Sequence, residues 1–464
     1  MIHIALSELI EVVEGELLAG SIETEFENYR IDSRLIETNE MFIPIVGDRF
    51  NGNDFIEKAF ELGASVSLIS DLSKRPLDIQ FENRALVYVK DTLVALQRLS
   101  AYLLMKAEIP VVAVTGSTGK TSTKEMIASI LGQNYNVLKN EGNFNNHIGL
   151  PLTLLRLTDE HEIAVLEMGM SGFGEIQRLA AITQPKIGVI TNIGESHIER
   201  LGSQEGIYKA KMEIASFMKK DNLLIVNGDD PFLKEKPEKI SYHRFAVGEN
   251  AKADLRLKSY ELTQTGSTFK ILYDGQPLQF ELNIPGYHSI QNAMLAIGVG
   301  LQIGLTLKEV KEGIKSFEGC GSRLHVLDLK PELKLIDDAY NASPDSMKAA
   351  LSVLSHYDEW YKVAVLGDML EMGEFGQEAH ERVGNMAMDS EVDELLLVGP
   401  MMKHAKVGAL KAGGNEEQIK HFENREELNT YLTHWKKDKT ILLVKGSLGM
   451  DMKYFIQQLK ECVK

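Results

Sequence analysis

The sequence predicts an α/β protein of three domains, and three observations support this fold class. The chain has 464 residues, enough for about three domains of ordinary size. Apolar, β-branched runs alternate with helical patterns along most of the chain, which is typical of parallel sheets covered on both faces. A stretch with period-two alternation and a glycine-rich break interrupt this order. We therefore expect domains over residues 1–105, 106–318 and 319–464.

The first domain is predicted to be a small α/β unit. Short apolar runs at 40–46 and 65–69 are typical of strands, and residues 91–105 show the apolar spacing of an amphipathic helix.

The central domain is predicted to hold a doubly wound, mostly parallel sheet with an antiparallel addition. Its buried-type strands are expected at 111–115, 163–168, 187–193 and 223–226. Residues 253–282 alternate in period two around Asp274 and Gly275, a pair that favours a tight hairpin turn, so this stretch is predicted to be antiparallel. A helix is expected at 289–303.

The last domain follows the glycine-rich break at 318–322 and is predicted to be Rossmann-like. Its apolar runs, separated by helical segments in the manner of a doubly wound fold, are expected to form strands at 333–337, 362–366, 394–398 and 440–444.

Composition excludes several classes of protein. The formal net charge of −17 disfavours binding to nucleic acid or to an anionic membrane surface, because both attract basic proteins. The two cysteines, Cys320 and Cys462, are too few for a disulfide framework or a four-sulfur metal site. Residues 1–15 lack a basic n-region and carry three glutamates, so we expect no signal peptide, and no apolar run reaches the roughly 18 residues that span a bilayer. We expect a cytoplasmic monomer without membrane insertion.

A glycine-rich loop between a strand and a helix predicts a nucleotide site. Backbone N–H groups of such a loop converge on phosphate oxygens, and the helix N-terminus adds positive partial charge. Lys120 would reach the terminal phosphates, and Thr121 would ligate Mg²⁺. Val114 stands where the usual longer loop has its first glycine, which indicates a shortened loop; a glycine turn with a solvated lysine is the alternative. The loop comprises Gly116, Ser117, Thr118, Gly119, Lys120, Thr121 and Ser122.

Polar residues that follow the next strands are candidate metal ligands. Glu167 ends the predicted strand at 163–168 and is a candidate Mg²⁺ ligand, with a solvent-exposed acid as the alternative. His197 follows the strand at 187–193 and is either a ligand or a hydrogen-bonded structural residue. By composition alone, Lys209, Lys211 and Glu213 open a helix with a solvated face. A surface position is expected for His380.

Several motifs together resemble the Mur ligases of peptidoglycan synthesis. The asparagine-rich loop at 141–153 and the Asp-Asp-Ala-Tyr-Asn-Ala stretch that begins at Asp337 are the most specific of them. The likeness is greatest to the branch that joins D-alanyl-D-alanine to UDP-N-acetylmuramoyl-tripeptide. Folylpolyglutamate synthetases share the shortened loop, but a resemblance to them does not account for the asparagine-rich loop. Further matching segments lie at 31–34, 42–55, 284–293, 322–323 and 366–373.

The resemblance implies roles for particular residues. Glu167 and His197 would ligate metal, and Lys211 would carry a carbamate that turns a cation into an anion able to hold a second Mg²⁺. The first domain would bind the UDP-sugar, the central domain ATP, and the last domain would close over ATP and bind the dipeptide. Ser33 and Arg34 would contact the uridine nucleotide. The nucleotide-sugar peptide would pass Asn143, Asn145 and Asn146. Asn292 would reach the adenine of ATP, and Arg323 and Asp338 would close over its phosphates and ribose.

Two positions depart from the family pattern. Asn53 stands where a histidine is usual, and Leu448 follows Lys445-Gly446-Ser447 where an arginine is common. A substrate contact by either usual side chain is therefore missing or replaced.

The chemistry that the resemblance implies is amide formation through an acyl phosphate. Such an intermediate hydrolyses in water, so the last domain is expected to close over the site through a hinge at 319–322. Another Mur ligase, a folylpolyglutamate synthetase-like ligase and a P-loop ATPase without ligase activity are the alternatives. L-lysine and diaminopimelate both stay open as the third peptide residue.

Overall fold

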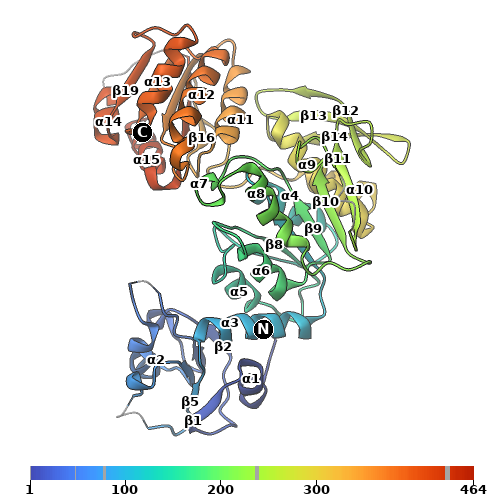
Figure 1. Ribbon diagram of the computed structural model, residues 1–464, viewed down its shortest axis with the longest axis vertical. Coiled ribbons are helices and arrows are strands. Elements are labelled where there is room, and N and C mark those ends of the chain that lie inside the picture. The colour runs from blue at the N-terminus through green and yellow to red at the C-terminus, as the bar shows by residue number, and fades with distance from the viewer. Residues whose placement is uncertain (1, 48, 77–79, 236–239, 434–438, 464) are drawn as a thin grey trace. The chain divides into compact units, whose positions relative to one another are not determined.

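The computed structural model describes residues 2–47, 49–76, 80–235, 240–433 and 439–463 and confirms the α/β class (Figure 1). Three sheets of five, nine and six strands follow one another along the chain. We call the parts of the chain built on them the N-terminal, central and C-terminal regions. The chain also divides into two compact units. One contains Met1–Ala113, Tyr135–Met170 and Glu175–Lys186; the other contains Val114–Asn134, Ser171–Gly174 and Ile187–Lys464.

The N-terminal sheet has the strand order β1-β5-β4-β3-β2, and only the pair β1–β5 is antiparallel among the pairs described. The strand predicted at 40–46 ends at Phe42, because Pro44 has no N–H to continue the ladder. The strands are β1 (Glu16–Gly20), β2 (Asn28–Arg30), β3 (Glu40–Phe42), β4 (Val66–Ile69) and β5 (Ala85–Tyr88).

Helices of the N-terminal region cover this sheet. The predicted helix at 91–105 forms as α3 (Thr92–Ala107), and the carboxylate of Asp91 caps it by accepting the N–H groups of Leu93 and Val94. Apolar side chains of α2 (Ile56–Leu62) pack against the sheet in a fully buried cluster that includes Phe60. The remaining helical segments are α1 (Leu6–Val13), η1 (Ser33–Leu35), η2 (Gly52–Phe55) and η3 (Leu72–Lys74).

The central sheet has the order β14-β13-β12-β11-β10-β9-β6-β8-β7. Its antiparallel addition is confirmed in β12, β13 and β14, where Asp274 (φ 47°) and Gly275 (φ 73°) form the tight turn. The parallel strand β11 was not predicted. The strands are β6 (Val111–Thr115), β7 (Val137–Lys139), β8 (Ile163–Glu167), β9 (Ile187–Ile190), β10 (Leu223–Asn227), β11 (His243–Gly248), β12 (Leu255–Leu262), β13 (Ser267–Tyr273) and β14 (Gln276–Leu282).

Helices of the central region follow the strands at the positions that bear on the site. The phosphate-loop helix α4 starts at Lys120, immediately after the loop. The helices are α4 (Lys120–Leu131), α5 (Gly149–Leu154), α6 (Glu175–Thr183), α7 (Ile198–Leu201), α8 (Gln204–Met212), η4 (Glu213–Ala215), α9 (Tyr287–Ile303) and α10 (Leu307–Lys315).

The C-terminal sheet has the order β15-β16-β20-β17-β18-β19, with β15 antiparallel to β16 and the other pairs parallel. All four predicted strands form. Every residue of β18 is buried, as expected of a strand covered on both faces. The strands are β15 (His325–Lys330), β16 (Leu333–Asp338), β17 (Tyr361–Gly367), β18 (Glu394–Val398), β19 (Ile419–Phe422) and β20 (Thr440–Lys445).

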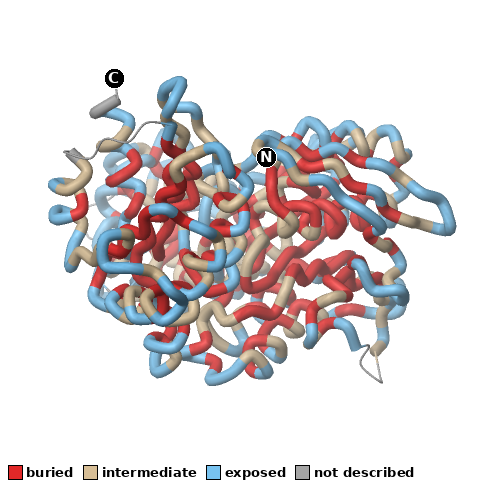
Figure 2. The backbone as a smooth tube through the Cα atoms, turned by 90° about the horizontal axis from the view of Figure 1, so that it is seen from above, coloured by how far each residue is buried: buried red, intermediate tan, exposed pale blue. Residues whose placement is uncertain are grey.

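Helices also cover the C-terminal sheet, and α11 begins with Ser343 in a capping box with Ser346. Buried stretches lie inside and loops are exposed, as Figure 2 shows. No described helix is both long and apolar enough to cross a membrane. The helices are α11 (Pro344–Ser355), η5 (Gly373–Phe375), α12 (Gly376–Asp389), α13 (Met402–Lys411), α14 (Arg425–Thr433), η6 (Leu448–Met450) and α15 (Met452–Val463).

Candidate active site

The glycine loop lies between β6 and α4, in the strand–loop–helix context that the sequence predicts. Its glycines are required by close approaches. A Cβ on Gly116 would lie 1.7 Å from Thr191 Oγ1, and one on Gly119 would lie 2.4 Å from Asn292 Oδ1. Gly119 also has a left-handed φ of 76°, which side chains disfavour. The loop therefore tolerates no side chain at these two positions, and the buried amide of Asn292 on α9 lies directly against it.

The residues after β9 hold the loop in place. The N–H of Ser117 donates to the carbonyl of Asn192 at 3.0 Å, and the N–H of Thr118 donates to the side-chain oxygen of Asn192 at 3.0 Å. The Asn192 amide donates in turn to Thr118 Oγ1 at 2.8 Å, and the Gly194 N–H donates to Ser117 Oγ at 2.8 Å. The strand predicted at 187–193 ends at Ile190. The Thr191 N–H still donates to the carbonyl of Thr115 at the end of β6 at 3.0 Å, but the carbonyl of Asn192 and the N–H of Gly194 bond to the loop.

Lys120 and Thr121 occupy the first turn of α4. Lys120 Nζ donates to the carbonyls of Gly116 and Ser117 at 2.8 and 3.3 Å, so its ammonium lies over the loop. Thr121 is buried, and the adjacent Ser122 Oγ lies 3.8 Å from the thiol of Cys320. A cation over a ring of backbone N–H groups at a helix N-terminus has the chemistry that binds phosphate.

Lys211 is fully buried in the last turn of α8, so the prediction of a solvated face is wrong for this residue. The helix also ends near Lys211 rather than opening there. Burial and the nearby charge of Lys120 hold the pKa of the Lys211 ammonium well below its ordinary value of 10.5. Within the described ranges no carboxylate forms an ion pair with this amine. Only the neutral form of such an amine is a nucleophile or a base, and burial favours that form.

His197 caps α7 with a left-handed φ of 64°. Its Nδ1 lies 2.6 Å from a carboxylate oxygen of Glu371 in the C-terminal region, and this contact lowers the pKa of Glu371. The described residues contain no group of three or more His, Cys, Asp or Glu side chains that could hold a metal ion. Only two of the predicted metal ligands, Glu167 and His197, are of these residue types, so the role of the predicted set in binding Mg²⁺ stays a prediction.

Glu167 and the asparagine loop belong to the other compact unit. Glu167 ends β8, is 3 % exposed, and accepts a hydrogen bond from the Asn145 amide at 2.7 Å. The exposed-acid alternative for Glu167 is thereby excluded. Asn146 accepts the N–H groups of Ile148 and Gly149, which start α5, whereas Asn143 is exposed. Two of the three asparagines thus shape this loop, a role that their sequence pattern did not indicate.

Ser33 and Arg34 form the short helix η1 of the N-terminal region. Ser33 is buried, whereas the Arg34 side chain is 85 % exposed and bonds to the Asp32 carboxylate at 2.6 Å. This pairing lowers the pKa of Asp32 to about 2. An exposed guanidinium held at one side by a carboxylate still presents donors to an anion.

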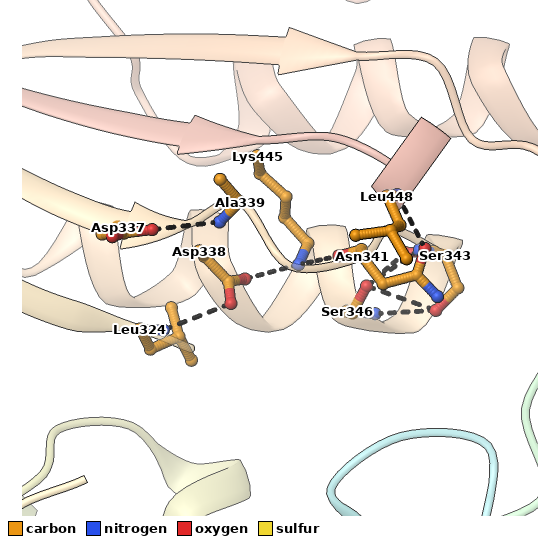
Figure 3. Close-up of polar contacts among 9 residues, drawn as sticks. All are labelled: Leu324, Asp337, Asp338, Ala339, Asn341, Ser343, Ser346, Lys445 and Leu448. Atoms are coloured by element: carbon orange, nitrogen blue, oxygen red, sulfur yellow. Dashed lines mark hydrogen bonds and ion pairs between the residues drawn. The ribbon is translucent and has the colours of Figure 1, made fainter. Parts of the chain in front are cut away.

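Polar residues at the ends of β16 and β20 meet in the C-terminal region (Figure 3). Lys445 Nζ donates to Asp338 at 2.5 Å and to the carbonyl of Asn341 at 2.9 Å. Burial raises the pKa of Asp338, and the Lys445 charge offsets part of this rise. Arg323 lies over the ring of Tyr340, 4.1 Å from its centroid. Sequence reasoning missed Lys445, although its place at the end of a predicted parallel strand was a usable signal.

His380 is fully buried in α12, so its predicted surface position is wrong. Its Nδ1 bonds to the Gly376 carbonyl at 2.6 Å, and its Nε2 accepts the Met369 N–H at 3.0 Å. Burial lowers its pKa, and the residue links α12 to the turn after β17.

A phosphate loop held at the end of a parallel strand, with a Rossmann-like region after it, defines a P-loop nucleotide-binding enzyme. Residues 114–300 match the Mur ligase middle domain, and residues 322–448 match the domain described as Mur ligase, glutamate ligase domain. The chain is 37 % identical to the UDP-N-acetylmuramoyl-tripeptide–D-alanyl-D-alanine ligase of Bacillus subtilis, with 99 % of both chains covered. It is 34 % identical to that of Escherichia coli at the same coverage.

Solved structures agree with these matches. The crystal structure of MurF from Acinetobacter baumannii superposes with a TM-score of 0.89 at 31 % identity and covers 98 % of each chain. The structure of the MurF ligase of Thermotoga maritima in complex with ADP superposes with a TM-score of 0.83 at 26 % identity, and the match covers 95 % of this chain and 98 % of that one. The chain belongs to the Mur ligase family, in the branch of the UDP-N-acetylmuramoyl-tripeptide–D-alanyl-D-alanine ligases.

The contact between Gly119 and Asn292 predicts a selective loss of nucleotide binding. In Gly119→Ala, the new methyl group meets Asn292 Oδ1 and the φ is strained, so we expect ATP affinity to fall by about tenfold or more. Gly275→Ala is the matched control, because Gly275 has a similar φ of 73° but no atom within 4 Å of the added Cβ. Calorimetric titration with ATP measures both variants. Equal affinities in the two would contradict the packing argument.

The buried amine of Lys211 predicts a pH-dependent stability difference. As pH falls below 10.5, the unfolded chain takes up a proton at Lys211 that the folded chain does not, so folding loses stability until the lowered folded pKa is reached. Lys211→Met removes this loss. In CO₂-free buffer the urea midpoint of the variant should therefore exceed that of the parent increasingly as pH is lowered from 10.5 towards the folded pKa. Lys209→Met, at an exposed residue of the same helix, is the control; parallel pH profiles of Lys211→Met and the parent would refute the prediction.

Proposed function

We propose that this chain joins D-alanyl-D-alanine to UDP-N-acetylmuramoyl-tripeptide while converting ATP to ADP and phosphate. The likeness to ligases of that name over 99 % of the chain carries the proposal. The phosphate loop at 116–122 supplies the ATP site that such a reaction needs. The product would be the pentapeptide precursor of peptidoglycan, made in the cytoplasm by a monomer.

The reaction proceeds in two displacements. A carboxylate oxygen of the tripeptide attacks the γ-phosphorus of ATP, the bond to the bridging oxygen breaks, and ADP leaves. The dipeptide amine then attacks the acyl carbon, phosphate departs with its oxygen, and the amine loses a proton. Lys120, whose ammonium lies over the loop, would stabilise the negative charge that moves on the phosphates during the first displacement.

The residues proposed to hold Mg²⁺ have suitable chemistry. Thr121 offers a buried hydroxyl at the start of α4, and Glu167 a buried strand-end carboxylate oriented by Asn145. His197 and a Lys211 carbamate complete the proposed set for two ions. The lowered pKa of Lys211 favours carbamate formation, because only a neutral amine adds to CO₂. Bound Mg²⁺ would neutralise charge on the transferring phosphoryl group.

The other substrates are assigned to the remaining regions. Residues 1–105 would bind the UDP-sugar, with the exposed guanidinium of Arg34 and the neighbouring Ser33 at the uridine nucleotide. Asn292, against the phosphate loop, would reach the adenine, and Arg323 and Asp338 the phosphates and ribose. Residues 319–464 would close over ATP and receive the dipeptide. Gly319 and Gly321, with left-handed φ values of 103° and 55°, give residues 319–322 the backbone freedom of a hinge.

The proposed reaction predicts that phosphate release requires all three substrates. With ATP and Mg²⁺ alone, turnover should be near background, and addition of both UDP-N-acetylmuramoyl-tripeptide and D-alanyl-D-alanine should start it. A coupled ADP assay measures the rate, and the lysine-containing and diaminopimelate-containing tripeptides are compared in parallel. Dipeptide-independent turnover as fast as the complete reaction would instead support a P-loop ATPase.

A carbamate on Lys211 predicts chemical rescue. Lys211→Ala should lose most activity, on the order of 100-fold, because an anionic ligand of the proposed second Mg²⁺ is removed. Short carboxylic acids such as acetate or formate fit the space left by the side chain and should restore part of the rate. Lys209→Ala should behave as the parent with or without the acids. An active Lys211→Ala variant would remove the carbamate from the mechanism.

A further inference from the structure

The segment 194–199, which follows β9 after three intervening residues, contacts the C-terminal region at four points. A Cβ on Gly194 would lie 2.0 Å from Asp345 Oδ2, which shows how closely α11 approaches the backbone here. The other points are Glu195 with Arg382, His197 with Glu371, and Glu199 with Gly373. Segment 194–199 is thus one of the places where the central and C-terminal regions meet within one compact unit; another is the Tyr357 hydroxyl, which donates to the Gln264 carbonyl at 2.8 Å.

The pair of Arg382 and Glu195 is the most specific of these contacts. Nη1 of Arg382 on α12 donates to Glu195 Oε1 at 3.0 Å, and Nη2 donates to Oε2, so the pair is bidentate. The side chains are 40 % and 18 % exposed, so water screens this pair less than a pair on the open surface. Asp345 also accepts the Glu195 N–H at 3.3 Å. A bidentate pair fixes orientation as well as distance, which a lysine contact would not.

The same segment is bonded to the phosphate loop. The Gly194 N–H donates to Ser117 Oγ at 2.8 Å, and Ser196 Oγ donates to the Ser117 carbonyl at 3.4 Å. Glu195 lies between these two residues. A shift of Glu195 therefore moves both partners of Ser117, and with them the loop that holds the phosphates.

We propose that Arg382 is a positioning residue, which fixes segment 194–199 by pairing with Glu195. Because this segment is bonded to Ser117, the phosphate loop takes its productive geometry only when the C-terminal region is docked and the pair is formed. Arg382 is not among the residues expected to touch ATP or the other substrates and acts through Glu195. The effect on turnover rests on the proposed function, whereas the contact itself does not. The arrangement makes ATP chemistry depend on docking of the C-terminal region, which protects an acyl phosphate from water.

Charge reversal tests the effect on turnover. Arg382→Glu and Glu195→Arg should each lower kcat/KM for ATP by about tenfold or more, and the double variant should recover most of the loss because the pair re-forms with exchanged charges. Arg425→Glu is the matched control, since Arg425 pairs with Asp451 inside the C-terminal region at 2.9 Å. It should keep the kinetics of the parent. A double variant as impaired as the single variants would overturn the proposal.

Hydrogen exchange tests the contact without reference to activity. The N–H groups of Gly194 and Glu195 are bonded to Ser117 and Asp345, so residues 194–199 should exchange faster in Arg382→Glu and return to the parent rate in the double variant. Unchanged exchange in Arg382→Glu overturns the proposal, as does faster exchange with parental kcat/KM. Ligase inactivity of the parent chain would refute the proposed function and with it the positioning role, while the exchange pattern would still report on the contact.

Discussion

The junction between the phosphate loop and the end of β9 is the constraint on which the rest of the site depends. Asn192 holds the loop with its carbonyl, its side-chain oxygen and its amide, and Thr191 Oγ1 donates to the Thr118 carbonyl at 2.5 Å. The loop can reach this partner only because Gly116 has no side chain. A nucleotide site made of backbone N–H groups needs such fixation, since these groups orient phosphate only if the backbone itself does not move. The same junction also positions the residues after Asn192, because the Gly194 N–H donates to Ser117 Oγ of the loop.

The acidity of the chain and its anionic ligands are reconciled by local charge. A net charge of −17 repels polyanions at a distance, yet positive groups gather where phosphates and carboxylates are expected. Lys120 lies over the loop, and Lys445 is buried beside Asp338. Burial and the nearby charge of Lys120 lower the pKa of Lys211 and so disfavour its charged form. Lys120 is thus the cation of the phosphate loop, whereas Lys445 is paired with a carboxylate and Lys211 is able to become anionic as a carbamate. This balance of charge suits a site that also binds Mg²⁺.

The sequence predicted the elements with strong local signals and missed those that depend on tertiary packing. Continuous apolar runs located β8, β17, β18 and β20, and alternation located the antiparallel β12–β14. The strand β11 starts with the polar residues His243 and Arg244, so the sequence shows no continuous apolar run there. Burial of Lys211 and His380 was missed, because a polar residue in a helical pattern looks solvated unless its neighbours in space are known. The partners Arg382 and Glu371 were missed for the same reason: each lies over 170 residues from the residue it contacts.

The two departures from the family pattern have different physical consequences. Asn53 is buried, and its side-chain oxygen accepts the Ser70 N–H at 2.9 Å, so it holds the turn after β4 and leaves no donor directed to solvent. Leu448 is 54 % exposed; its N–H donates to Asn341 Oδ1 at 3.4 Å, and its carbonyl accepts the Asp451 N–H at 3.1 Å. The Asn341 carbonyl also accepts a hydrogen bond from Lys445, and both Arg323 and Lys453 lie over the Tyr340 ring, with Lys453 Nζ 5.5 Å from the ring centroid. Cationic side chains therefore remain around this sheet edge although position 448 carries none, and an anion held there would meet two residues anchored on one aromatic ring.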